Sequence, residues 1–181
     1  MATNIPPHNV KEICDALLLV INDPKCGFKD IMKVLPGPDF PTGGIICGKK
    51  GIVDAYTTGR GHLKLRAKTE VETDQRGRER IAGTETPYPL SKTAILSKIA
   101  ECVHGGTIPE IADVRDESDR HGLRIVVELK KDSDSEVVLN KLFRYTPLQT
   151  TFAIANIALV NNQPETLNLS LIHISEPTRP Y

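Results

Sequence analysis

Four basic side chains recur at every second position of one short segment: His62, Lys64, Arg66 and Lys68. Apolar or small residues stand between them, so the segment has the period of two that is typical of a β-strand. Charges two residues apart on a strand lie about 6.6 to 6.8 Å from one another. Two steps between phosphates along one DNA strand, about 3.4 Å each, span a similar length. The spacing therefore fits a phosphate-binding surface and equally a solvated sheet face.

Further basic or polar residues could extend such a surface. Arg76, Arg78 and Arg80 follow in a segment that leans basic. His8 and Asn9 stand at the start of a predicted helix, where free backbone N–H groups and the positive end of the helix dipole favour a phosphate. In the simpler interpretation, Asn9 only caps the helix.

Clustered carboxylates are the residues most suggestive of a metal site: Asp113, Asp116, Glu117 and Asp119. Mg²⁺ and Ca²⁺ prefer such oxygen ligands, but the spacing of an EF-hand loop is absent. Arg115 stands among the acids and favours a local salt-bridge network instead. The few histidines suggest no catalytic constellation, and no P-loop occurs. We therefore predict no metal site and no catalytic residue.

Composition narrows the class of protein further. The 181 residues carry 23 basic and 23 acidic side chains, so a basic surface would have to be local. The four cysteines show no C-x-x-C pair, which favours a reducing interior. No apolar run reaches the roughly 18 residues that a membrane-spanning helix needs. We expect a cytoplasmic protein that does not enter the membrane.

The hydrophobic pattern predicts an α+β fold. Apolar positions at helical spacing predict a helix over 10–22, and strict alternation predicts a strand that includes 63–71. From residue 78 onwards the predicted order is β-α-β-β-α-β, which is the ferredoxin-like arrangement. We expect this unit and the strand over 63–71 to form one antiparallel or mixed sheet, with the N-terminal helices nearby.

Several motifs resemble a known family in order along the chain: Met-Ala-Thr-Asn-Ile-Pro-Pro-His-Asn at 1–9, Gly-Pro-Asp-Phe-Pro-Thr at 37–42, Gly-Arg-Gly at 59–61 and Arg-Asp-Glu-Ser-Asp at 115–119. Together they closely resemble the A subunit of bacterial DNA gyrase and, next to it, the corresponding subunit of topoisomerase IV. The resemblance extends from Met1 to about Asn168. It identifies the chain as similar to the tower domain of type IIA DNA topoisomerases.

The resemblance implies a role in holding DNA. In that family a winged-helix domain with the DNA-cleaving tyrosine precedes this segment, so Met1 resembles an internal methionine. Tyr145 follows Arg144 as the catalytic tyrosine follows an arginine, but its context resembles the tower's own motif, and we interpret it as structural. The resemblance implies double-stranded DNA as the partner, contacted through its backbone. It also implies an A2B2 assembly of two A and two B subunits, in which the B subunit supplies ATP hydrolysis and Mg²⁺, and no cofactor in this fragment.

The expected organisation has three parts: 1–60 and 61–168 as the two parts of the tower domain, and 169–181 as a non-native tail. The tail departs from the family and is similar to the translation of a transposon-end sequencing adapter, so we expect it to be dispensable. The alternative function is a stand-alone ferredoxin-like module that binds RNA or a small effector. Sheet-face RNA binding needs exposed aromatic side chains, and only Phe152 lies on a predicted strand.

Overall fold

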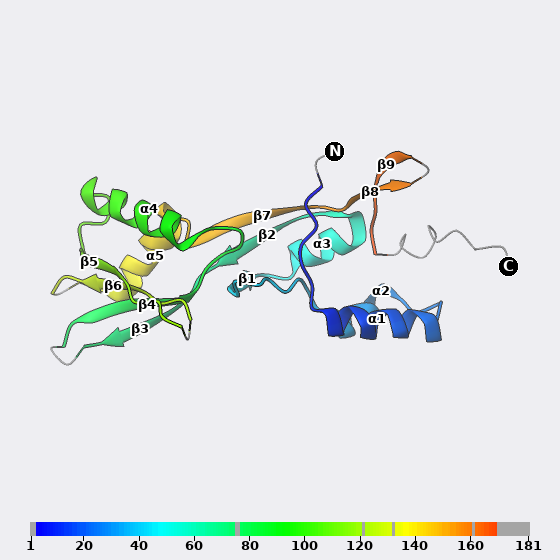
Figure 1. The fold of residues 1–181 in the computed structure, drawn as a ribbon, viewed down its shortest axis with the longest axis horizontal. Coiled ribbons are helices and arrows are strands. Elements are labelled where there is room, and N and C mark those ends of the chain that lie inside the picture. Colours follow the sequence, from blue (N-terminus) through cyan, green and yellow to red (C-terminus); the bar gives the residue numbers. More distant parts are fainter. Residues whose placement is uncertain (1–2, 75–76, 121, 132, 161, 170–181) are drawn as a thin grey trace. The chain divides into compact units, whose positions relative to one another are not determined.

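The computed structural model describes residues 3–74, 77–120, 122–131, 133–160 and 162–169, which form two compact units (Figure 1). Unit 1 takes the described parts of Met1–Pro41, Gly48–Leu63 and Thr151–Tyr181, and unit 2 those of Thr42–Cys47 and Lys64–Thr150. The α+β class with antiparallel pairing is confirmed. The three-part organisation expected from the sequence stays a prediction, and the tail from residue 170 onwards lies outside the described residues.

Unit 1 is mainly helical. It contains α1 (Val10–Asn22), α2 (Phe28–Val34), α3 (Lys50–Thr58) and a hairpin of β8 (Ile157–Val160) with β9 (Gln163–Thr166). As predicted, α1 begins at Asn9, whose Oδ1 accepts a hydrogen bond from the backbone N–H of Lys11 at 3.0 Å. The apolar side chains of α1 are largely exposed, with Leu17 at 51% and Ile21 at 71%.

Unit 2 is a sheet covered by two helices. Its strands lie in the order β3 (Lys68–Thr73), β4 (Glu79–Glu85), β6 (Ile125–Leu129) and β5 (Ile111–Asp116), all antiparallel to their neighbours. Figure 1 shows α4 (Lys92–His104) and α5 (Ser135–Tyr145) on the same side of this sheet. Ile99 of α4 and Leu142 of α5 are fully buried in one core with Ile81 and Val127 of the strands. Because α4 connects β4 to β5 and β6 lies between them, the first part of the predicted ferredoxin-like arrangement, a split βαβ unit, is confirmed.

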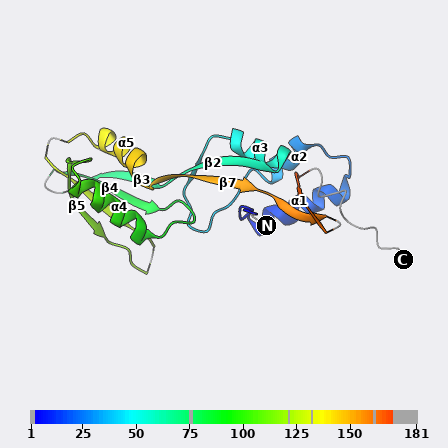
Figure 2. The same ribbon diagram turned by 90° about the horizontal axis from the view of Figure 1, so that it is seen from above.

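A second sheet joins distant parts of the chain in the order β1 (Ile45–Cys47), β2 (Arg60–Arg66) and β7 (Gln149–Ala155), and Figure 2 shows β2 and β7 side by side. The prediction of one strand and one sheet was therefore wrong. The predicted strand over 63–71 is interrupted at Ala67, whose N–H donates to the carbonyl of Leu148 at 2.8 Å. Its second half, β3, pairs with β4, and so takes the place beside β4 that a ferredoxin-like fold would give to β7.

The interruption at Ala67 also changes the predicted apolar face. Leu63, Leu65 and Ala67 are buried as expected, at 2% exposure or less, whereas Val71 is 46% exposed. Val71 lies on β3, which is an edge strand of its sheet. Across the described residues, no helix is long and apolar enough to cross a membrane.

Candidate nucleic-acid interface

Strand β2 places the first three basic candidates by simple alternation. Gly61, Leu63 and Leu65 are buried, while His62 and Lys64 between them are exposed and Arg66 is half-buried. Successive side chains of a strand point to opposite faces, so one face of β2 carries buried residues and the other carries basic residues. The predicted alternation holds from His62 to Arg66. His62 belongs to unit 1, whereas Lys64 and Arg66 belong to unit 2.

Lys64 is the candidate whose ammonium group is most available. It is exposed and pairs in register with Cys47 of β1. No described acidic side chain forms an ion pair with it. A lysine ammonium offers three rotatable donors and acts as a compact point charge, which suits contact with a phosphate oxygen.

The side chain of Arg66 is held in place by contacts with residues of its own unit. Its Nε and Nη2 both donate to Gln149 Oε1, at 3.0 and 2.7 Å, and its guanidinium carbon lies 4.5 Å from the centroid of the Phe143 ring. A guanidinium carries five N–H donors, more than this single acceptor can use. Arg66 is therefore fixed in direction and retains donors for an anion. No local sequence pattern points to Gln149 or Phe143, which are 83 and 77 residues away along the chain.

Lys68 lies beyond the interruption at Ala67, at the start of β3. Its Nζ is 3.7 Å from Glu85 Oε1, with both side chains at least a third exposed. An exposed pair of this kind contributes little to stability and can open at small cost. Lys68 can therefore exchange its carboxylate partner for a phosphate.

Of the three later arginines, the two that the structure describes differ in their contacts. Arg76 lies outside the described residues, and Arg78 is exposed just before β4. Arg80 is engaged, because its Nε lies 2.8 Å from Glu72 Oε2. The same carboxylate accepts from Arg124 at 2.8 Å, and this hydrogen bond is the main cause that lowers the pKa of Glu72. Glu72 thus neutralises charge on Arg80 and keeps it inside a local network.

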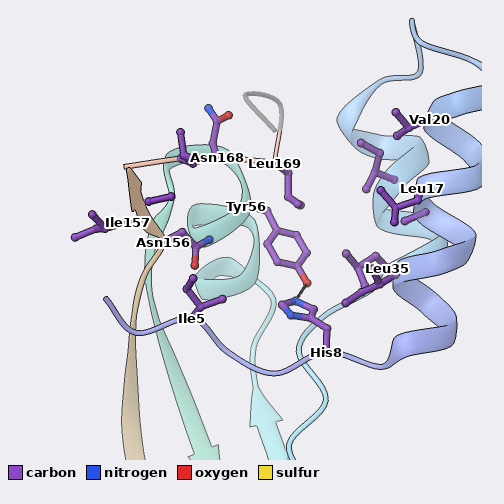
Figure 3. A pocket seen from close by; sticks show the side chains of 15 residues that line it. Ile5, His8, Leu17, Val20, Leu35, Tyr56, Asn156, Ile157, Asn168 and Leu169 are labelled. Atoms are coloured by element: carbon purple, nitrogen blue, oxygen red, sulfur yellow. Dashed lines mark hydrogen bonds between the residues drawn. The ribbon is translucent and has the colours of Figure 1, made fainter. Parts of the chain in front are cut away.

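His8 points into unit 1 (Figure 3). Its Nε2 lies 2.7 Å from the hydroxyl of Tyr56, its Nδ1 lies 2.9 Å from the carbonyl of Pro6, and its ring stacks on Tyr56. Burial lowers the pKa of His8, which favours the uncharged ring at neutral pH. Asn9 caps α1 and also donates to Asp39 at 3.3 Å. Both residues thus have structural partners, and their proposed phosphate contact stays a prediction.

Three of the four acidic residues predicted as a cluster near β5 are paired with cations. Asp113 contacts Arg115 at 2.9 Å, Asp116 contacts Lys92 at 2.9 Å and Glu117 contacts Arg124 at 3.2 Å. The local network predicted for Arg115 is thus confirmed, and it includes Glu128 at 3.4 Å. Hydrogen bonds from Ser118 and Lys92 lower the pKa of Asp116 to about 2. In the described part of the chain, no group of three or more His, Cys, Asp or Glu side chains is placed to hold a metal ion.

Tyr145 is the last residue of α5 and is 44% exposed. The guanidinium carbon of Arg144 lies 5.5 Å from the centroid of its ring. The arginine that resembled a catalytic neighbour is therefore stacked on the tyrosine. The structural interpretation of Tyr145 stays a prediction.

Comparison with known proteins adds to this geometry. The family model for the A chains of DNA gyrase and topoisomerase IV matches residues 1–175. The DNA gyrase A protein of Clostridium acetobutylicum is 49% identical over 172 residues, which is 95% of this chain and 21% of the relative. Those of Brachyspira hyodysenteriae and Chlamydia trachomatis are 52% and 51% identical over 170 residues, 93% of this chain and 20% of each relative. The chain thus spans about a fifth of the length of the curated relatives it matches.

Proposed function

Because the chain belongs to the family of DNA gyrase and topoisomerase IV A subunits, we propose that it is a DNA-binding scaffold segment of a type IIA topoisomerase. In this proposal it supports the duplex that the full enzyme cleaves, passes and reseals. The observation that carries the proposal is the exposed Lys64 on the charged face of β2, which has no ion-pair partner among the described residues. Arg66 and Lys68 follow it along the same stretch of chain.

The chemistry of this surface suits the DNA backbone and not the bases. Phosphate contacts from lysine and arginine fix position without reading sequence, whereas base recognition needs an element that enters a groove. Lys64 and Lys68 present single charges, and Arg66 is held in one direction by Gln149. Such a surface is expected to bind many sequences alike and to weaken steeply as salt rises.

The proposal places the chain within a larger assembly. As part of a gyrase-like A chain it would act in the bacterial cytoplasm, together with a second A chain and two B chains. ATP hydrolysis and Mg²⁺ would come from the B chains. The acids that contact Lys92, Arg115 and Arg124 near β5 have no role as Mg²⁺ ligands in this proposal.

The alternative, a ferredoxin-like RNA-binding module, would need an exposed aromatic side chain on a strand. Phe152, the aromatic residue predicted on a strand, does not meet this need. Phe152 on β7 is 6% exposed and packs edge-to-face on Phe40, with ring centroids 5.3 Å apart. A base cannot stack on a ring that is buried in this way. Backbone contact with duplex DNA is the function that the described residues support.

Binding measurements on the whole chain test the proposal. We expect two duplexes of unrelated sequence, titrated by fluorescence anisotropy at salt concentrations from about 50 to about 200 mM, to bind alike. Contacts from Lys64, Arg66 and Lys68 should contribute about −2.7 to the slope of log K against log salt. Sequence-dependent binding with no salt dependence would refute the proposal, and preference for single-stranded RNA would favour the alternative.

A further inference from the structure

A second group of basic residues lies in unit 1, at positions that are not among the candidates predicted from the sequence. Lys49 lies between β1 and α3, Lys50 is the first residue of α3, and both are exposed. Neither forms an ion pair with any described residue. The segment Gly48–Leu63 carries three permanent cations, which include Arg60, against one carboxylate, Asp54, a net charge of 3 − 1 = +2.

Two glycines fix this pair of lysines beside β2. A Cβ on Gly51 would lie 2.1 Å from the carbonyl oxygen of His62, and a Cβ on Gly61 would lie 2.5 Å from the carbonyl oxygen of Gly51. Both distances are far below van der Waals contact, so backbone meets backbone here and only glycine fits. The start of α3, where Lys49 and Lys50 stand, therefore abuts β2 at His62, one of the predicted DNA contacts.

The stability of α3 does not account for the two lysines. Cations at a helix N-terminus face the positive end of the helix dipole and destabilise the helix. Here Lys49 is the N-cap residue without a side-chain hydrogen bond to the helix, and the first turn contains no acidic residue to offset the charge. The two ammonium groups are thus exposed, without an ion-pair partner in the described part of the chain, and unfavourable for the helix that they begin.

We propose that Lys49 and Lys50 bind backbone phosphates of duplex DNA and give unit 1 a phosphate-binding pair of its own. This inference rests on the proposed function, because the ligand is the same duplex. It adds two phosphate contacts in unit 1, the unit that also contains the exposed His62. A duplex that reaches this pair gains two phosphate contacts without any base recognition.

A charge-matched set of variants of the whole chain tests the inference. K49Q/K50Q should make the slope of log K against log salt less negative by about 1.8, from roughly 0.9 for each phosphate. The control K25Q/K29Q removes two lysines from the same unit and should leave the slope unchanged. K49R/K50R retains both charges and should retain the wild-type slope. Circular dichroism should show K49Q/K50Q folded, because the substitutions remove an unfavourable dipole interaction.

The outcomes separate this inference from the proposed function. If the wild-type chain binds duplex DNA with strong salt dependence and K49Q/K50Q has the wild-type slope, the pair is not a phosphate contact and the inference fails alone. If K25Q/K29Q changes the slope as much as K49Q/K50Q does, DNA binding responds only to the net charge of the chain, and the inference also fails. If the wild-type chain does not bind duplex DNA, the proposed function fails first.

Discussion

Arg66 and Gln149 join β2 to β7 through one acceptor: Nε and Nη2 of Arg66 both donate to Gln149 Oε1, at 3.0 and 2.7 Å. The guanidinium also lies over the ring of Phe143. Lys64, two residues earlier on the same face, has no such partner among the described residues. Neighbouring cations on one strand thus differ in their contacts: Arg66 is held by residues of its own unit, whereas the ammonium group of Lys64 is held by no ion pair among the described residues.

This difference predicts different effects on stability. Arg66→Met should lower the free energy of unfolding by about 1 kcal/mol, because it removes hydrogen bonds to Gln149 and a cation–π contact at a half-exposed site. Lys64→Gln should change it by less than about 0.5 kcal/mol, as exposed positions usually do. Urea unfolding of both variants measures this. Equal midpoints would show that the Arg66 contacts contribute nothing in solution.

Arg78 and Arg80 should differ in DNA binding. Arg78 is exposed, whereas Arg80 lies 2.8 Å from the Glu72 carboxylate. We expect Arg78→Gln to make the slope of log K against log salt less negative by about 0.9, the value of one phosphate contact. Arg80→Gln should leave the slope nearly unchanged. The reverse order in salt titrations would mean that the network around Glu72 opens when DNA binds.

The pair His8–Tyr56 predicts a dependence of stability on pH. Burial lowers the pKa of His8 in the folded chain, whereas an unfolded histidine titrates near about 6.5. The unfolded state therefore binds the proton first as pH falls, so the stability is complete above the unfolded pKa and is lost as pH falls from there through the folded pKa. The shifted carboxyl groups, such as Glu72 and Asp116, have lowered pKa values and act below this window.

Urea unfolding between about pH 7.5 and 5 measures this dependence across the titration range of histidine. The free energy of unfolding of the wild-type chain should fall more steeply with decreasing pH than that of His8→Gln. His62→Gln is the control, because it removes an exposed histidine from the same unit. If His62→Gln flattens the pH dependence and His8→Gln does not, the assignment to His8 is incorrect.

Tyr145 should not form a bond to DNA. Its ring is stacked by Arg144 at the end of α5, and its family context implies a structural role. We expect Tyr145→Phe to bind duplex DNA like the wild-type chain, and denaturant trapping to show no covalent adduct with either protein. An adduct that disappears in Tyr145→Phe would make this residue catalytic.

Local patterns predicted much of the fold, because short-range signals determine its helices and hairpins. The Asn9 cap located the start of α1, and strict alternation located the buried Leu63 and Leu65. The interruption at Ala67 was missed because its cause, a hydrogen bond to Leu148, lies 81 residues away in sequence. The same alternation continues through β3, so no local feature marks the change from one sheet to another.

The sequence predicted which basic residues make up the candidate interface, but not which of their charged groups are free to bind a ligand. Residue type and spacing identified Lys64, Arg66 and Lys68, but not the partners Gln149 and Glu85 that distinguish them. Lys49 and Lys50 were missed because two adjacent lysines have no strand or helix periodicity. Their place beside His62 depends on the backbone contact between Gly51 and β2.

The most direct measurement of the central claim is the salt dependence of duplex binding by K64Q/K68Q. These two lysines are exposed and lie in unit 2, as do Lys130 and Lys131, so K130Q/K131Q is a control of equal charge. If the charged face near β2 contacts the DNA backbone, K64Q/K68Q should make the slope of log K against log salt less negative by about 1.8, and the control should not change it. An unchanged slope in K64Q/K68Q, in a chain that still binds DNA, would show that these residues are only a solvated sheet face.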